Sequence, residues 1–89
     1  MSTSHHGNED LFLELEGEVH VKREPLTLEE MQEIVGGYIQ VVYLENGDQL
    51  IVDEDGLMKQ KFPNRKASIL AQRLIVGVAI LLKGDAKLK

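Results

Sequence analysis

The sequence predicts a small α+β domain, a mixed sheet of about four to five strands with two helices. Three observations predict this fold class. Apolar and charged residues alternate from Leu11 to Val21, which is the period of a β-strand. A capping box at Thr27 begins a helix, and Asn46-Gly47 between two apolar runs indicates a β-hairpin. The predicted order is β-α-β-β-α-β, preceded by an extra N-terminal strand.

Eighty-nine residues make one domain. We place this domain at residues 9–84, because residues 1–8 lack periodicity and have few apolar groups, as a disordered tail does. The last residues, 85–89, are expected to form a frayed basic tail.

The first strand segment is predicted to bury one face. Its odd positions are apolar or glycine, and its even positions are mostly charged. Either one long strand is kinked at Gly17, or two strands meet there. A three-residue loop, Glu16-Gly17-Glu18, would pair Leu15 with Val19 and keep the faces matched. His20 falls on the polar face and is expected to be solvated.

The first helix has clear signals at both ends. Thr27 is the N-cap, Glu30 completes the capping box, and Gly36-Gly37 ends the helix. The apolar residues that share one face are Leu28, Met31, Ile34 and Val35. The strand from Tyr38 to Leu44 that follows is apolar on both faces, which is typical of a central strand.

The Asn46-Gly47 turn sets the expected register of the hairpin. A two-residue loop pairs Leu44 with Gln49 and Val42 with Ile51. It also places the like charges of Glu45 and Asp48 opposite each other.

The second half is predicted to contain one helix and one strand. Pro63 stops a weakly alternating extended piece, and Asn64 caps a helix over about Arg65 to Arg73. The candidates for its buried side are Ala67, Ile69 (or Leu70) and Leu74. A largely buried strand then runs over residues 74–83. Both helices are expected on one face of the sheet.

Charge is divided unequally along the chain. Residues 1–58 hold 14 acids and two bases, a net charge of −12, whereas residues 59–89 hold eight bases and one acid, a net charge of +7. We expect the two halves to fold together and their charges to pair. There is no cysteine, no apolar run of about 20 residues and no basic start followed by an apolar stretch. The sequence therefore favours a cytoplasmic protein.

One helix start is a candidate anion site. Bases in the first turn of a helix oppose the helix dipole unless an anion lies there. The five residues predicted to bind this anion are Lys59, Lys61, Asn64, Arg65 and Lys66. Alternatively, the bases pair with acids of the first half.

The acidic turns are predicted to be a solvated end of the sheet rather than a metal site. They hold Glu45, Asp48, Asp53, Glu54 and Asp55. After Asp53 and Asp55, the next ligand position of a calcium loop falls on Leu57. No Ser/His/Asp arrangement is visible, so we expect no catalytic residues, no metal and no cofactor.

Four segments in order resemble a family known as domain of unknown function 3846, over about residues 19–83. They are Met31-Gln32-Glu33-Ile34-Val35-Gly36-Gly37-Tyr38-Ile39, then residues 51–57, 62–68 and 75–80. Gln40 and Val78 depart from the acids that the family often has at these positions. The resemblance implies a phage or plasmid accessory protein and no defined reaction, and it leaves Leu11 to Glu16 outside the match.

These features favour a non-catalytic binding module that sequesters a host protein or a small anionic ligand. In one variant, the acidic surface of residues 1–58 mimics nucleic acid. The alternative is a nucleic-acid-associated regulator whose basic face is Lys59, Lys61, Arg65, Lys66 and Arg73. An unpaired strand edge is a template for another chain, so we also expect a homodimer formed through Leu11 to Leu15.

Overall fold

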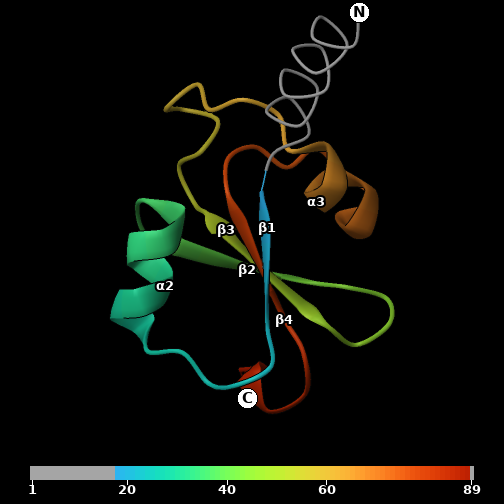
Figure 1. The fold of residues 1–89 in the computed structure, drawn as a ribbon. Helices are drawn as coiled ribbons and strands as arrows, with labels where there is room; N and C mark the ends of the chain where they lie inside the picture. The colour runs from blue at the N-terminus through green and yellow to red at the C-terminus, as the bar shows by residue number, and fades with distance from the viewer. Residues whose placement is uncertain (1–17, 89) are drawn as a thin grey trace, which may run out of the picture.

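The computed structural model describes residues 18–88. In chain order, the elements are β1 (Val19–Lys22), α2 (Leu28–Val35), β2 (Ile39–Tyr43), β3 (Gln49–Asp53), α3 (Arg65–Ala71), β4 (Ala79–Leu82) and the short 3-10 helix η1 (Gly84–Ala86). The predicted order β-α-β-β-α-β is therefore confirmed (Figure 1). The predicted tail at 1–8 and the strand segment at 11–17 lie outside the described residues.

The four strands form one mixed sheet in the order β1-β4-β3-β2. β1 runs parallel to β4, with Val19 opposite Ala79, whereas β3 is antiparallel to both of its neighbours. β2 is consequently an edge strand, and the prediction that it is central was wrong. A strand can be apolar on both faces at an edge when a helix covers each face of the sheet.

The two helices lie on opposite faces of the sheet, not on one face as predicted (Figure 1). Met31 and Val35 of α2 pack against Ile51 and Ile80. On the other face, Ala67 of α3 packs in a separate cluster, whose remaining buried members are Val42, Leu50, Val52, Ile75, Ala79 and Leu81. Successive residues of β3 alternate between these clusters, as the pleat requires.

The first helix has the predicted ends. Thr27 accepts a hydrogen bond from the Glu30 amide, and the Glu30 carboxylate accepts one from the Thr27 amide. Gly36 ends the helix in the left-handed conformation, with φ 84°. Leu28, predicted on the buried face, is exposed at the first position of the helix, two turns before the buried Val35.

The hairpin register differs by one residue from the prediction. Tyr43 pairs with Gln49, and the Leu44 amide donates to the Asp48 carbonyl. The loop is therefore Glu45-Asn46-Gly47, with the positive φ of Gly47, 91°, at its third position. A left-handed third residue is the usual conformation of a three-residue hairpin loop, and glycine adopts it without steric cost.

The second helix is shorter and less buried than predicted. Asn64 caps it as expected, but α3 ends at Ala71, and of the predicted buried residues only Ala67 is buried. The others, Ile69, Leu70 and Leu74, are exposed because a seven-residue helix turns only its two alanines, Ala67 and Ala71, toward the sheet.

The strand at the end of the chain is also shorter than predicted. β4 contains four residues, and Val76 instead forms an isolated bridge with Pro63. In the predicted extended piece at residues 57–62, residues 57–60 form turns, and residues 61 and 62 have no regular secondary structure. Residues 84–88 do not fray, since Ala86 is buried and the Gln49 side chain hydrogen-bonds both backbone groups of Leu88.

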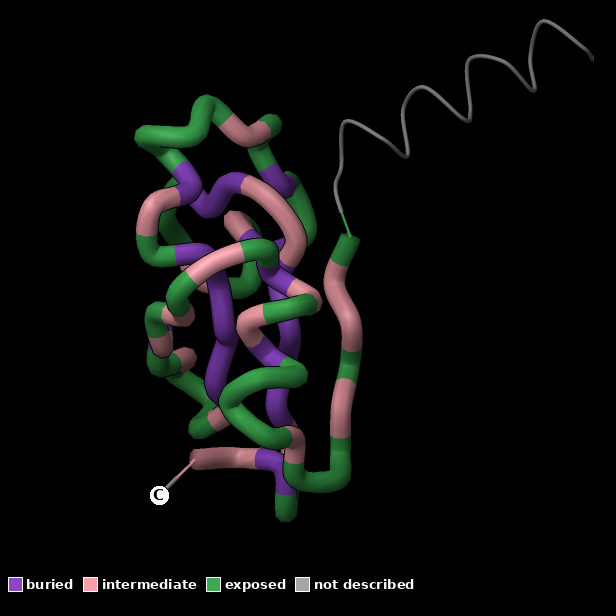
Figure 2. The backbone as a smooth tube through the Cα atoms, turned by 90° about the vertical axis from the view of Figure 1, so that its left-hand side faces the viewer, coloured by how far each residue is buried: buried purple, intermediate pink, exposed green. Residues whose placement is uncertain are grey.

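Burial is concentrated in β3 and β4, the purple strands at the centre of Figure 2. β1 runs along the outside of the molecule and has no fully buried residue. No helix in the described part of the chain is long and apolar enough to cross a membrane.

Candidate functional site

The structure divides the five predicted anion-binding residues among three environments. Lys59 and Lys61 turn inward to Asp53 at the end of β3. Their Nζ atoms lie 2.8 and 2.7 Å from the same oxygen, Oδ2, of Asp53. They also donate to the Gly36 and Val35 carbonyls at the end of α2, at 3.0 and 2.7 Å. The two lysines therefore bind a carboxylate and a helix C-terminus of the protein itself.

Asp53 is the centre of this cluster, and its side chain is fully buried. Burial by itself would raise the pKa of the carboxyl group, but hydrogen bonds from Lys59, Lys61 and the Asp55 amide outweigh it and lower the pKa to about 2. The carboxylate is therefore ionised at neutral pH. The lysine–carboxylate cluster, defined here as Asp53, Lys59 and Lys61, closes the turns at 54–61 over the end of α2.

Asn64 lies inside the protein, and its side chain forms hydrogen bonds with the backbone of three segments. Its Oδ1 accepts a hydrogen bond from the Ala67 amide at 3.0 Å and so caps α3. Its Nδ2 donates to the carbonyls of Glu18 and Gly77, at 2.8 and 2.7 Å. Because Asn64 has no exposed surface, it positions three segments and presents no donor to solvent.

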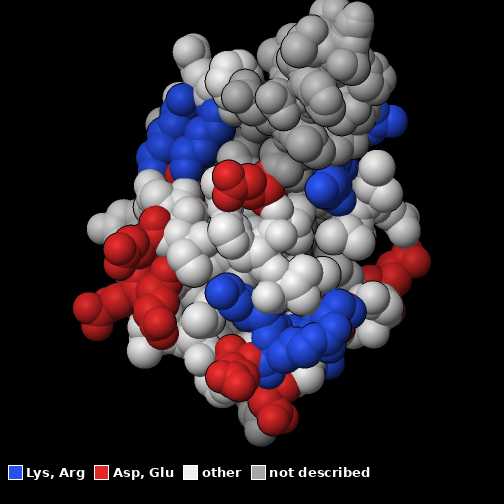
Figure 3. All heavy atoms as spheres, in the orientation of Figure 1, with Lys and Arg blue, Asp and Glu red and all other residues white. Residues whose placement is uncertain are grey.

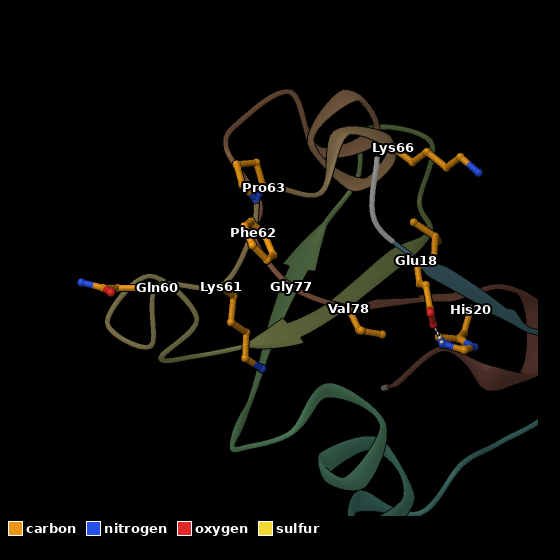
Figure 4. A pocket seen from close by; sticks show the side chains of 10 residues that line it. Glu18, His20, Gln60, Lys61, Phe62, Pro63, Lys66, Gly77 and Val78 are labelled. Atoms are coloured by element: carbon orange, nitrogen blue, oxygen red, sulfur yellow. Dashed lines mark hydrogen bonds and ion pairs between the residues drawn. The ribbon is translucent and has the colours of Figure 1, made fainter. Parts of the chain in front are cut away.

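Arg65 and Lys66 are exposed in the first turn of α3. Lys66 lies beside an open groove of about 900 Å³ at the start of β1. Figure 4 shows its lining: Glu18, Val19 and His20 from the β1 end, residues 60–63 from the turns, and Gly77 and Val78 before β4. The groove was not predicted, because it joins segments that are distant in the sequence.

Most of the groove is apolar, and its charged groups lie at the ends. Phe62 is 77% exposed beside Pro63 on one wall. In Figure 4 the Lys61 side chain runs toward the end of α2, whereas the Lys66 side chain extends away from Phe62 and Pro63. His20, expected to be solvated, is partly buried and hydrogen-bonds Glu18 at 3.0 Å. This arrangement can hold an apolar group and place an acidic substituent near Lys66.

The acidic turns do not converge on one point. Asp53 belongs to the lysine–carboxylate cluster, while Asp48 binds Lys83 on β4's C-terminal side. The hydrogen bond from Lys83 lowers the pKa of the Asp48 carboxyl group. Within residues 18–88, no group of three or more His, Cys, Asp or Glu side chains is placed to hold a metal ion.

Comparison with known proteins identifies a family. The model of a family described as Domain of unknown function (DUF3846) matches residues 11–88. This match is wider than the resemblance at 19–83, and it places Leu11 to Glu16 inside the family domain rather than outside it. No curated protein and no solved structure is significantly similar to the chain.

Proposed function

The chain belongs to the family described as Domain of unknown function (DUF3846), and we propose that it is a non-catalytic binding module of a mobile genetic element. It acts in the cytoplasm by sequestering a host protein or a small anionic ligand. The observation that carries this proposal is the apolar groove at the start of β1, with Lys66 beside it. The mobile-element origin rests on the family resemblance alone.

The size and lining of the groove suit a ligand. Binding sites for small molecules enclose roughly 300–1,000 Å³ and are mainly apolar with a few polar groups. Here the apolar wall is formed by Val19, Phe62, Pro63 and Val78. The ligand chemistry that fits combines an apolar body with a carboxylate or phosphate. Such a group is found both on free metabolites and on acidic, apolar segments of a host protein.

The structure gives less support to the nucleic-acid alternative. Of its five basic residues, Lys59 and Lys61 hydrogen-bond the buried Asp53 and the end of α2. Figure 3 shows the blue side chains of one face in separate patches, interrupted by white and red atoms. Non-specific nucleic-acid binding uses a continuous basic surface. Nucleic-acid binding is therefore kept as one outcome of the titration described below.

Two measurements test the proposal. Native mass spectrometry of protein purified gently from cells reports a bound small molecule or host protein directly. NMR titration then uses phenyl phosphate, which has an apolar ring and an anionic group, with sulfate and short DNA as comparison ligands. We expect phenyl phosphate to shift the amides of His20, Phe62 and Lys66, and sulfate to shift them less.

A pair of charge-reversed variants provides the control. Lys66→Glu and Arg73→Glu make the same change of charge at exposed positions, the first in the first turn of α3 and the second just after its C-cap. Lys66→Glu should weaken phenyl phosphate binding about tenfold, whereas Arg73→Glu should not. Equal weakening of DNA binding by both variants, without any groove response to phenyl phosphate, would favour the regulator instead.

A further inference from the structure

One edge of the sheet is unpaired in the described part of the chain. The carbonyls of Glu18 and Lys22 accept hydrogen bonds from the amides of Ala79 and Lys83, at 3.1 and 2.9 Å. Backbone groups of alternate strand residues point in opposite directions. The N–H and C=O groups of Val19 and Val21 therefore point away from β4, and no described strand pairs with them.

The same edge leaves an apolar side chain uncovered. Val21 pairs with Leu81 and so lies on the face of the sheet that α3 covers. α3 does not reach this part of β1, and Val21 is 51% exposed. Figure 3, which looks onto this edge, shows mostly uncharged atoms at its centre, with basic and acidic groups below.

We propose that the edge of β1 binds residues 11–15 of a second copy of the chain, so that two copies exchange these segments and form a symmetric dimer. The family match begins at residue 11, so the segment belongs to the domain. Its alternating pattern provides Leu11, Leu13 and Leu15 for one face. Self-association here does not require a ligand in the groove.

Charge complementarity sets the direction of pairing. In an antiparallel arrangement with Leu13 opposite Val21, Glu14 lies opposite His20, and Glu9 and Asp10, which precede the segment, come just beyond the end of β1. That end carries Lys22 and Arg23. In the same register, Leu13 covers the exposed side of Val21.

The residue at position 18 favours pairing with a second copy over a hairpin formed within the same chain. A three-residue loop that paired Leu15 with Val19 would place Glu18 at the position that Gly47 occupies in the other hairpin, which needs a positive φ. Glutamate carries a Cβ atom and rarely adopts that conformation, whereas glycine adopts it readily.

The first test is the oligomeric state of the full chain, measured by sedimentation over a wide range of concentrations. We expect a dimer. Val21→Pro removes an outward-facing N–H and blocks the edge without removing a donor to β4, and Leu13→Asp places a charge on the apolar face of the segment. Each should raise the dimer dissociation constant at least about tenfold, whereas Val21→Thr should not. A full chain that is monomeric at every concentration would overturn the proposal.

A cross-link shows which copy provides the segment. The chain has no cysteine, so Leu13→Cys and Val21→Cys introduce the sole thiols. When the two single variants are mixed and oxidised, disulfide-linked dimers containing one of each are expected. If the double variant instead oxidises to a monomer with an internal disulfide, the segment folds back onto its own chain and the exchange is refuted.

Discussion

Asp53 shows how one buried charge organises a large part of this molecule. It lies at the end of β3, and the two lysines that bind it lie in the turns before α3 and reach across to the carbonyls that end α2. Gly37 makes this approach possible, because a Cβ atom there would lie 2.4 Å from Lys59 Nζ and 3.0 Å from Asp53 Oδ1. The double glycine therefore both ends a helix and leaves room for the lysine–carboxylate cluster.

Acid should weaken the fold through this carboxylate. Its pKa in the folded protein, about 2, lies below the ordinary value of 3.8. The stabilising contribution is therefore complete above about pH 4 and is lost as the pH falls toward 2. We expect about 2 kcal/mol of the free energy of unfolding to disappear over this range, measured by urea denaturation at each pH.

The variant Asp53→Asn tests the origin of this acid dependence. It should destabilise the protein at neutral pH by a similar amount, because two lysines lose their carboxylate, and it should flatten the pH profile between 4 and 2. Glu54→Gln changes the neighbouring, exposed carboxyl group and should leave the profile unchanged. An unaltered slope in Asp53→Asn would contradict the assigned cause.

At the scale of elements, the hairpin shows that one residue of register decides which side chains meet. The predicted two-residue turn places Glu45 opposite Asp48, so that reversing the charge at Asp48 would relieve repulsion. The observed three-residue loop places Asp48 opposite Leu44 and beside Lys83, whose Nζ lies 2.5 Å from its carboxylate. Asn46 also bonds both the amide and the carboxylate of Asp48.

Asp48→Lys should therefore destabilise the protein, the opposite of what the predicted register implies. The new lysine would face Lys83 and lose the bonds from Asn46. Glu45→Lys makes the same charge change at an exposed loop position and serves as the control, with little expected effect. The midpoints of urea denaturation of both variants are compared with that of the unchanged protein. A higher midpoint for Asp48→Lys than for the unchanged protein would support the two-residue turn instead.

Local signals predicted the caps of both helices, and tertiary packing decided what they missed. Thr27 and Asn64 cap as expected because capping depends on neighbouring residues. Which face of the sheet each helix covers depends on the order of the strands. That order includes the pairing of β1 with β4, which are about 60 residues apart in the sequence. The groove and the lysine–carboxylate cluster were missed for the same reason, although Gly36-Gly37 before two closely spaced lysines was a usable signal.

At the scale of the whole molecule, the unequal charges of the two halves meet in pairs. The ion pairs Lys59–Asp53, Lys61–Asp53 and Lys83–Asp48 each join a base from residues 59–89 to an acid from residues 1–58. Two of these three pairs share the buried carboxylate of Asp53. Part of the charge asymmetry along the sequence is therefore a feature of folding and not a surface for partners.

The two helices pack against the sheet to different extents, and this difference predicts that they differ in local stability. α2 buries Met31 and Val35 against the sheet, whereas α3 places only Ala67 and Ala71 there and leaves Ile69 67% exposed. The helices have similar lengths, eight and seven residues, so their internal hydrogen bonds differ little. Regions with few buried apolar contacts open locally, without unfolding of the rest.

We therefore expect native-state hydrogen exchange to separate the two helices. Amides of β3, β4 and α2 should exchange only when the whole domain unfolds, and their exchange should accelerate steeply with added denaturant. Amides of α3 should exchange faster and depend weakly on denaturant, because a small surface is exposed when α3 opens. Asn64→Ala, which removes the cap and its bonds to Glu18 and Gly77, should increase this separation. Equal protection of α3 and β3 in the unchanged protein would show instead that the domain opens as a single unit.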